Sequence, residues 1–395
     1  MPFLAGSLAF ERFRVSGFED TKFEEQHVEV LSNYAGGQLE LGSQDAVQIG
    51  FLGGRHVLDQ SFDQGKNIVN GALHCSVRID TNQVPASLKK AWMQMELAAR
   101  AAENDSGRPT RQQRQEAKEA VEQRSLAEAA SGKFRKMQHY PLLWDLPGQR
   151  LYFAGSGSAV IGHSLELLER AFSVETSRIT AGTLALEWAT INDKFSELDD
   201  AVPAQFVPEM SHSDLAWLGS DLNNKDFLGN EFLVWLWWKL ANETDSFTLL
   251  DQSEITVMMN KTLTLECPLG ENGKESISAE SPMHLPEAIR ALQSGKLPRK
   301  SGLTLIRHGT QYDLTVQAES FSISAAKIHV DEEADPYDTD ARIDAIREMN
   351  ETLDLLFSYF CSLRIPAKAW KAELRGIQSW LNSANPANLR RNPAA

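Results

Sequence analysis

The sequence Leu73-His74-Cys75-Ser76-Val77-Arg78-Ile79 alternates strictly between apolar and polar residues. A period of two places the apolar side chains on one face of a β-strand and the polar side chains on the other. The stretch therefore predicts a strand that is buried on one face only. Leu8 and Phe10 alternate with their neighbours in the same way. We predict that residues 3–80 are mostly β-structure.

The chain changes character at Pro85. One helical stretch extends from Pro85 to Arg100, and a second follows the break at 107–110 and continues to Ala130. The second stretch is too polar to be buried on all sides, so we predict a projecting helical hairpin, or tip, over residues 85–133. A thin apolar stripe on it is formed by Leu88, Trp92, Met95 and Val121. A partner chain could complete this stripe at a dimer interface, and a solvated surface hairpin is an equally good alternative.

Further along, the pattern predicts both strands and helices. Residues 151–153 predict a strand and 161–172 a helix, while Leu184, Leu186 and Trp188 alternate and predict another strand. The Trp-rich stretch 232–238 is apolar on nearly every face, which predicts a helix buried in the core or in an interface.

The last third of the chain continues this mixture. Short alternating runs between 246 and 330 predict antiparallel strands, interrupted by a helix at 286–293. Apolar faces at 343–360 and 370–380 predict a helical C-terminus. The fold class that we expect is therefore α+β, with antiparallel sheets.

Composition restricts the function. The chain has 395 residues, with 39 Lys and Arg against 54 Asp and Glu, giving a formal net charge of −15. A general binder of polyanions is excluded, and any nucleic-acid site must gather its cations on one surface. Cys75, Cys267 and Cys361 are widely spaced, which is typical of a reducing cytosol and argues against a structural zinc site. The apolar stretch 227–241 is shorter than a membrane span, so we expect a soluble, cytoplasmic protein.

Catalytic and metal-binding patterns are weak. Residues 155–158, Gly-Ser-Gly-Ser, lack the third glycine of a dinucleotide site and the lysine of a P-loop, so a plain turn is favoured. The run 331–340 holds six carboxylates but lacks the glycine and closing glutamate of a calcium loop. The nine histidines form no pair with metal-ligand spacing. We predict no catalytic residues, no metal and no cofactor.

Cations are more informative. Arg111, Arg114 and Lys118 are spaced by three and four residues, so they share one helix face. A second island contains Lys133, Phe134, Arg135 and Lys136. Residues 290–310 hold no acidic residue, and the cations there include Lys296, Arg299 and Lys300. We predict that these islands converge on one surface that holds a phosphate backbone. Ordinary solvated surface charge is the alternative.

The order and spacing of three stretches resemble the recombination-associated protein RdgC family. The residues that carry the resemblance are Gly42-Ser43-Gln44-Asp45 with Gly50-Phe51 and Asn70-Gly71, then Lys118-Glu119-Ala120-Val121 with Leu143-Trp144-Asp145 and the helix at 161–172, then Pro286-Glu287-Ala288-Ile289 with Gly295-Lys296 through Lys300. The resemblance covers most of the chain outside 190–245.

The resemblance implies a division into three regions. These are a central α+β region (1–84 and 134–175), the helical tip (85–133) and a base (176–395), in which 190–245 is an acidic, Trp-rich insertion. It also implies a ring-shaped homodimer that encircles double-stranded DNA with little sequence preference. It further implies a protein that is not an enzyme, is nucleoid-associated and modulates a RecA-type recombinase and replication restart.

Two other functions stay open at this stage. The acidic insertion and its aromatic helix could bind a protein partner, which would make the chain an interaction scaffold without DNA binding. The carboxylates of 331–340 could instead serve a metal-dependent nuclease.

Overall fold

The structure is a computed structural model that describes residues 3–37, 47–207, 215, 224–268, 273–329 and 338–383. Three segments named above lie outside these ranges, namely Gly42–Asp45, residues 208–214 and 216–223 of the acidic region, and 330–337 of the carboxylate run. Within the described ranges the chain is α+β, with one large and mainly antiparallel sheet surrounded by helices.

The strands of the sheet have the order β10-β9-β11-β12-β13-β1-β6-β5-β4-β2, with β3, β7 and β8 paired at its sides. Their bounds are β1 Leu8–Ser16, β2 Val47–Leu52, β3 Ile68–Val69, β4 Ala72–Asn82, β5 Arg135–Asp145, β6 Arg150–Phe153, β7 Glu175–Arg178, β8 Ser246–Thr248, β9 Glu254–Glu266, β10 Glu275–Ala279, β11 Leu297–Arg307, β12 Thr310–Gln317 and β13 Ile323–His329.

The helices pack around this sheet, except for one pair. Their bounds are α1 Glu25–Asn33, α2 Gln64–Asn67, α3 Ala86–Ala102, α4 Arg111–Ala130, α5 Ser158–Phe172, α6 Ala181–Ile191, α7 Phe195–Asp199, α8 Phe227–Asn242, α9 Pro286–Gln293, α10 Thr339–Arg364 and α11 Ala367–Ser383, with a short 3₁₀ turn at Pro282–His284. None of these helices is long and apolar enough to cross a membrane.

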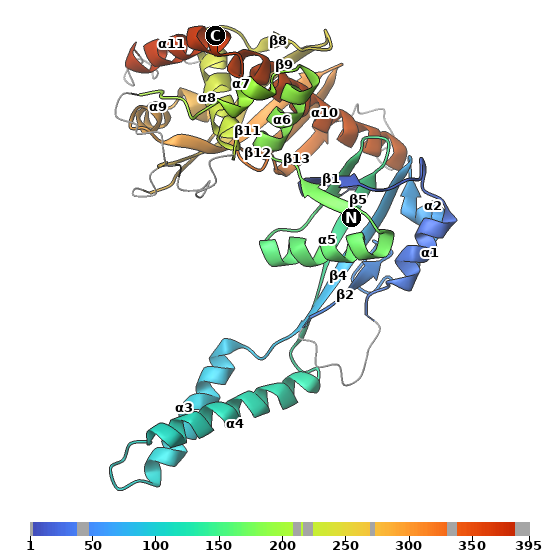
Figure 1. The fold of residues 1–395 in the computed structure, drawn as a ribbon, viewed down its shortest axis with the longest axis vertical. Coiled ribbons are helices and arrows are strands. Elements are labelled where there is room, and N and C mark those ends of the chain that lie inside the picture. Colours follow the sequence, from blue (N-terminus) through green and yellow to red (C-terminus); the bar gives the residue numbers. More distant parts are fainter. Residues whose placement is uncertain are drawn as a thin grey trace.

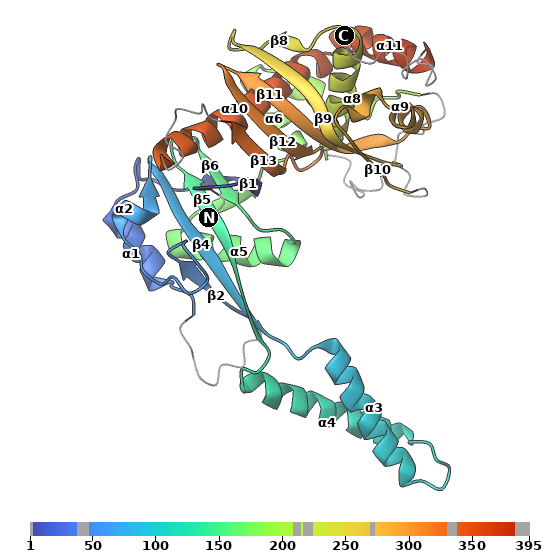
Figure 2. The same ribbon diagram turned by 180° about the vertical axis from the view of Figure 1, so that it is seen from behind.

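Strand β1 joins two halves of the sheet. It pairs with β13 through Leu8 and Phe10 and with β6 through Glu11, Arg12 and Phe13. We call β8–β13 with α6–α11 the base, and β1–β7 with α1, α2 and α5 the central region. Helices α3 and α4 form the arm, which extends away from the ends of β4 and β5 (Figure 1). In both views the base and the arm lean to the same side, opposite α1 and α2 (Figures 1 and 2).

Two strand predictions need correction. The segment around Leu184, Leu186 and Trp188 is helix α6, not a strand. Thr180 caps this helix and accepts a hydrogen bond from the amide of Thr183, and Leu184 and Trp188 are buried while Leu186 is exposed. The buried residues Leu184 and Trp188 are four positions apart, which is the period of a helix, and the alternation with Leu186 was coincidental.

Strand β4 is present as predicted, but it is buried on both faces. Leu73, Cys75, Val77 and Ile79 face one core, whereas His74, Ser76 and Arg78 are buried on the other face. The loop before β4 covers that face, since Asn67 donates to the carbonyl of His74 and Arg78 donates to the carbonyl of Val57. Polar side chains on an alternating strand can thus be covered by the chain itself.

Helix α8 is the centre of the base, and the interpretation of its aromatic residues as core is confirmed. Trp235 and Trp237 are completely buried. The ring of Phe232 packs edge-on against Phe357 with centroids 5.5 Å apart. Gly229 allows α8 to approach the segment that follows β12, because a Cβ at this position would lie 1.8 Å from the carbonyl oxygen of Ala318.

Candidate nucleic-acid interface

The arm carries the most accessible group of predicted cations. Arg111, Arg114 and Lys118 all project from α4 into solvent. None of them has a carboxylate within 4.0 Å in the described part of the chain. Helix α4 begins with a capping box in which Thr110 accepts from the amide of Gln113, so the first of these cations lies on well-formed helix.

The charges in the first turns of α4 are arranged by sign, and Glu122 ends the cationic flank one turn after Lys118. At 100° per residue, the cations Arg111, Arg114 and Lys118 lie on one flank of the helix, about 140° from Glu116 and Glu119. The stripe that packs against α3, formed by Ala117 and Val121, lies beside the cationic flank. This arrangement presents one positive edge over about 10 Å of helix.

The island at the root of the arm is divided in its roles. Arg135 lies in an ion pair with Asp80 at 2.5 Å and is mostly buried, but Asp80 also binds Arg78, so one carboxylate serves two cations. Lys133 is exposed, with Glu128 at 3.5 Å. Lys136 is exposed on β5. Phe134 packs against the small core of the arm, so its ring is partly buried against the protein.

The island on β11 is mostly paired. Lys296 binds Glu275 and is largely buried. Arg299 lies 3.3 Å from Glu266 and 2.6 Å from Glu319. Lys300 is exposed, and no carboxylate of the described residues lies within 4.0 Å of it. The structure therefore leaves Lys300 as the accessible cation among the three predicted positions of this island.

The apolar stripe of the arm is largely used within the chain. Trp92 and Val121 are buried in a small cluster with Val84, and Leu88 packs against it. The guanidinium of Arg124 lies 4.4 Å from the centre of the Trp92 ring. Met95 remains 65% exposed. Of the four residues predicted for a dimer interface, Met95 is the one whose side chain is mainly open to contact.

Sequence reasoning missed the carboxylates that neutralise these cations. Asp80 reaches Arg135 because β4 and β5 are paired, with Asp80 opposite Met137. Glu266 and Glu275 reach β11 across neighbouring strands. No local pattern around 290–310 contains these residues, and only a correct strand order would have found them. Asp80 directly follows the alternating stretch 73–79, and it was the one partner carboxylate that the sequence placed beside a predicted strand.

The described residues can be compared with the requirements of a metal site and of a reactive thiol. No group of three or more His, Cys, Asp or Glu there is placed to hold a metal ion. Burial raises the pKa of the Cys75 and Cys361 thiols far above the usual value, so these thiols are packing residues. Of the carboxylate run, Asp338 caps helix α10 by accepting from the amide of Ala341.

No family model matches this sequence, and no curated protein matches it.

Proposed function

We propose that the protein binds double-stranded DNA without sequence preference, with the arm as the principal contact. The observation that carries this proposal is the separation of charge. Residues 83–136 hold eleven Lys and Arg against seven Asp and Glu, whereas the remainder of the chain holds 28 against 47. An acidic body repels a polyanion, so an exposed basic arm gives DNA one favoured place to bind.

The binding is driven by counterion release. Exposed cations without protein partners neutralise phosphates and free the ions condensed on the duplex. The side of helix α4 carries Arg111, Arg114 and Lys118, which would contact the phosphate backbone of DNA. That backbone carries no sequence information. Lys136 of the central region and Lys300 of the base are exposed and would supply further contacts.

The biological role that we propose follows the RdgC resemblance. Two copies would join and enclose the duplex, with Met95 among the residues of the arm-to-arm contact. Enclosure would hold the protein on DNA without base contacts and would limit access of a RecA-type recombinase. The protein would act by occupying the duplex and would catalyse no reaction. Solution mass measured with and without duplex tests the dimer, because the proposal requires a mass of two chains on each enclosed duplex.

The experiment that tests the DNA site compares two matched triple variants. The first is Arg111→Gln with Arg114→Gln and Lys118→Gln. The control is Lys368→Gln with Lys371→Gln and Arg375→Gln, which removes three exposed cations of the same spacing from α11 in the base. Affinity for a random duplex is measured between 50 and 200 mM salt.

We expect the arm variant to lower the slope of log affinity against log salt by about 2.7, because each phosphate contact contributes about 0.9. The control should keep the slope of the wild-type protein. Equal slopes for the two triple variants would overturn the assignment of the site to the arm. A wild-type protein that shows no salt-dependent binding would overturn DNA binding itself.

A further inference from the structure

The apolar cores of the molecule divide it into two parts. We call the base and the central region together the body. One sheet runs through the body from β2 to β10, and one core contains residues of both regions, such as Leu143 of β5 and Trp235 of α8. The arm has a cluster of its own around Val84, Trp92 and Val121. In the described part of the chain, this cluster and the cores of the body have no residue in common.

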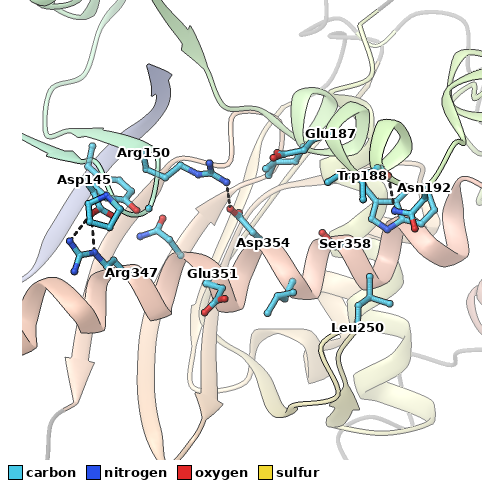
Figure 3. Close-up of a pocket in the computed structure, with 17 residues that line it drawn as sticks. Asp145, Arg150, Glu187, Trp188, Asn192, Leu250, Arg347, Glu351, Asp354 and Ser358 are labelled. Carbon is cyan, nitrogen blue, oxygen red and sulfur yellow. Dashed lines mark hydrogen bonds and ion pairs between the residues drawn. The ribbon is translucent and has the colours of Figure 1, made fainter. Parts of the chain in front are cut away.

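Helix α10 fixes the two regions of the body to each other. Arg347 binds Asp145 at the end of β5 at 2.7 Å, and Asp354 binds Arg150 of β6 at 3.4 Å (Figure 3). Asp354 also binds the buried Arg12 of β1, at the point where β1 joins the two halves of the sheet. The C-terminal half of the same helix is packed in the core of the base. Because one helix is held on both sides of the joint, the body resists bending there.

The arm leaves the body at the ends of β4 and β5 through two short links (Figures 1 and 2). The links are residues 83–85, before α3, and residues 131–134, after α4. Val84 and Phe134 pack into the cluster of the arm, so each link is attached to the arm. On the body side, Asn82 and Arg135 lie opposite each other in the β4–β5 ladder. The chain can therefore bend next to Asn82 and next to Arg135, where strands of the body end.

One side-chain hydrogen bond crosses from the body to the arm among the described residues. The side-chain amide of Asn82 donates to the main-chain carbonyl of Ala129, in the last turn of α4. The other side-chain atom of this amide, Oδ1, is buried and has no hydrogen-bond partner in the described structure. The ion pairs of the arm and its links, such as Lys133 with Glu128, are internal to it. A single hydrogen bond is a weak connection compared with a shared core.

We infer that the root of the arm is a hinge that Asn82 latches, and that the arm moves about it as one rigid body. Folded units that share no large apolar interface move relative to each other. Loss and recovery of the bond from Asn82 to Ala129 exchanges a held arm with a free one. The hinge divides the cationic island 133–136, because Lys133 lies on the arm side and Lys136 lies on β5. The inference does not depend on DNA binding.

The experiment measures distances between spin labels by double electron–electron resonance. It uses the full chain with Cys267→Ser, in which Cys75 and Cys361 are buried and stay unlabelled. The labels are attached at exposed positions of helices in three pairs, which report arm to body, within the arm, and within the body. These pairs are Gln123→Cys with Glu166→Cys, Ala99→Cys with Gln123→Cys, and Glu166→Cys with Ala372→Cys.

Each pair is measured in the otherwise unchanged chain, in Asn82→Ala and in Gln83→Ala, the control that alters the adjacent exposed residue. We expect the arm-to-body distribution to be wider than the distribution within the body. In Asn82→Ala it should become about twice as wide as the one within the body, because the latch is gone, and Gln83→Ala should not change it. The distribution within the arm should stay narrow in all three proteins.

Three results would contradict the inference. An arm-to-body distribution in Asn82→Ala that is as narrow as the one within the body would overturn the hinge. Widening within the arm would overturn motion as a rigid body, since the arm would then unfold rather than swing. Equal widening with Asn82→Ala and Gln83→Ala, or no widening with Asn82→Ala, would overturn the role of Asn82 as the latch.

Discussion

The arm and the base use the same types of residue in opposite ways. In the base, several cations are paired and partly buried, as in Arg364 with Glu231, Arg307 with Asp251 and Lys296 with Glu275. In the arm, Arg111, Arg114 and Lys118 have no such partners in the described structure. The number of positive charges in a stretch of sequence therefore does not locate a binding surface. Only cations that the fold has not already neutralised remain for a ligand.

Apolar residues show the same contrast. The base and the adjoining part of the central region share one continuous core around α8, with Trp235, Trp237 and Phe232 fully buried. The cluster of the arm has only Val84, Trp92 and Val121 as buried members. Because folding free energy follows buried apolar area, we expect the arm to open at a lower free energy than the region around this core.

The largest effect should come from breaking the pair of Arg364 and Glu231. Both side chains are buried, and Arg364 also donates to the carbonyl of Val202. In Arg364→Met the carboxylate of Glu231 keeps no cationic partner in the core. We expect the free energy of unfolding to fall by about 3–5 kcal/mol, as is typical when one partner of a buried ion pair is removed. Chemical denaturation followed by tryptophan fluorescence measures it.

The control for this prediction removes both charges. Glu231→Gln with Arg364→Met leaves no buried charge, so most of the lost stability should return. A single variant as stable as the wild-type protein would show that the paired cations of the base do not hold its fold, and the contrast with the arm would lose its basis.

The second effect is confined to the arm. Trp92→Ala removes the largest member of the small cluster and the ring that Arg124 covers. We expect the opening free energy of α3 and α4 to fall by about 3 kcal/mol, the lower end of the range for such substitutions, because few neighbours surround the cavity. Hydrogen exchange of the amides of α3, α4 and α8 measures it, and exchange in α8 should not change.

Leu126→Ala is the matched control, since this residue lies on α4 of the same arm and is 63% exposed. Its effect should stay below about 0.5 kcal/mol. Faster exchange in α8 after Trp92→Ala would mean that the arm and the base unfold as one unit.

The third effect separates the central region from the arm by pH. Burial is the main cause that lowers the pKa of His74, to about 4, and the charge of Lys66 lowers it further. The unfolded chain therefore binds a proton near pH 6.5 that the folded chain does not bind until about pH 4. Stability is lost as the pH falls through this window, by about 2 kcal/mol between pH 7 and pH 5. The difference between wild type and His74→Gln, measured by denaturation at both pH values, isolates this contribution.

Residues 85–133 contain no histidine. Hydrogen exchange in the arm, corrected for intrinsic rates, should therefore show no matching loss over the same pH range. An equal pH dependence in wild type and His74→Gln would contradict the burial of a neutral imidazole on β4.

Much of the fold could be predicted from the sequence where one periodicity was dominant. The helix at Pro286–Gln293 and the two terminal helices were predicted because their apolar faces are long and regular. Helix α6 was missed because Leu184, Leu186 and Trp188 fit a period of two as well as a helix. The capping threonine at Thr180 was the local signal that would have decided between them.

The candidate site could be predicted only in part, for a different reason. Whether a cation is exposed depends on its neighbours across the sheet, and those neighbours are far apart in sequence. Arg299 and Glu319 are 20 residues apart, yet they lie 2.6 Å from each other. The cations of α4 escape this problem because their neighbours are set by the helix itself.

The smallest effect compares two lysines of one island. Lys300 is exposed, whereas Lys296, four residues earlier, is held by Glu275. If only unpaired cations bind phosphate, Lys300→Gln should lower the salt slope of DNA binding by about 0.9, and Lys296→Gln should leave it unchanged. Both variants are measured on the same duplex between 50 and 200 mM salt. An equal decrease with Lys296→Gln would mean that its ion pair opens when DNA binds, and pairing in the free protein would then no longer distinguish the base from the arm.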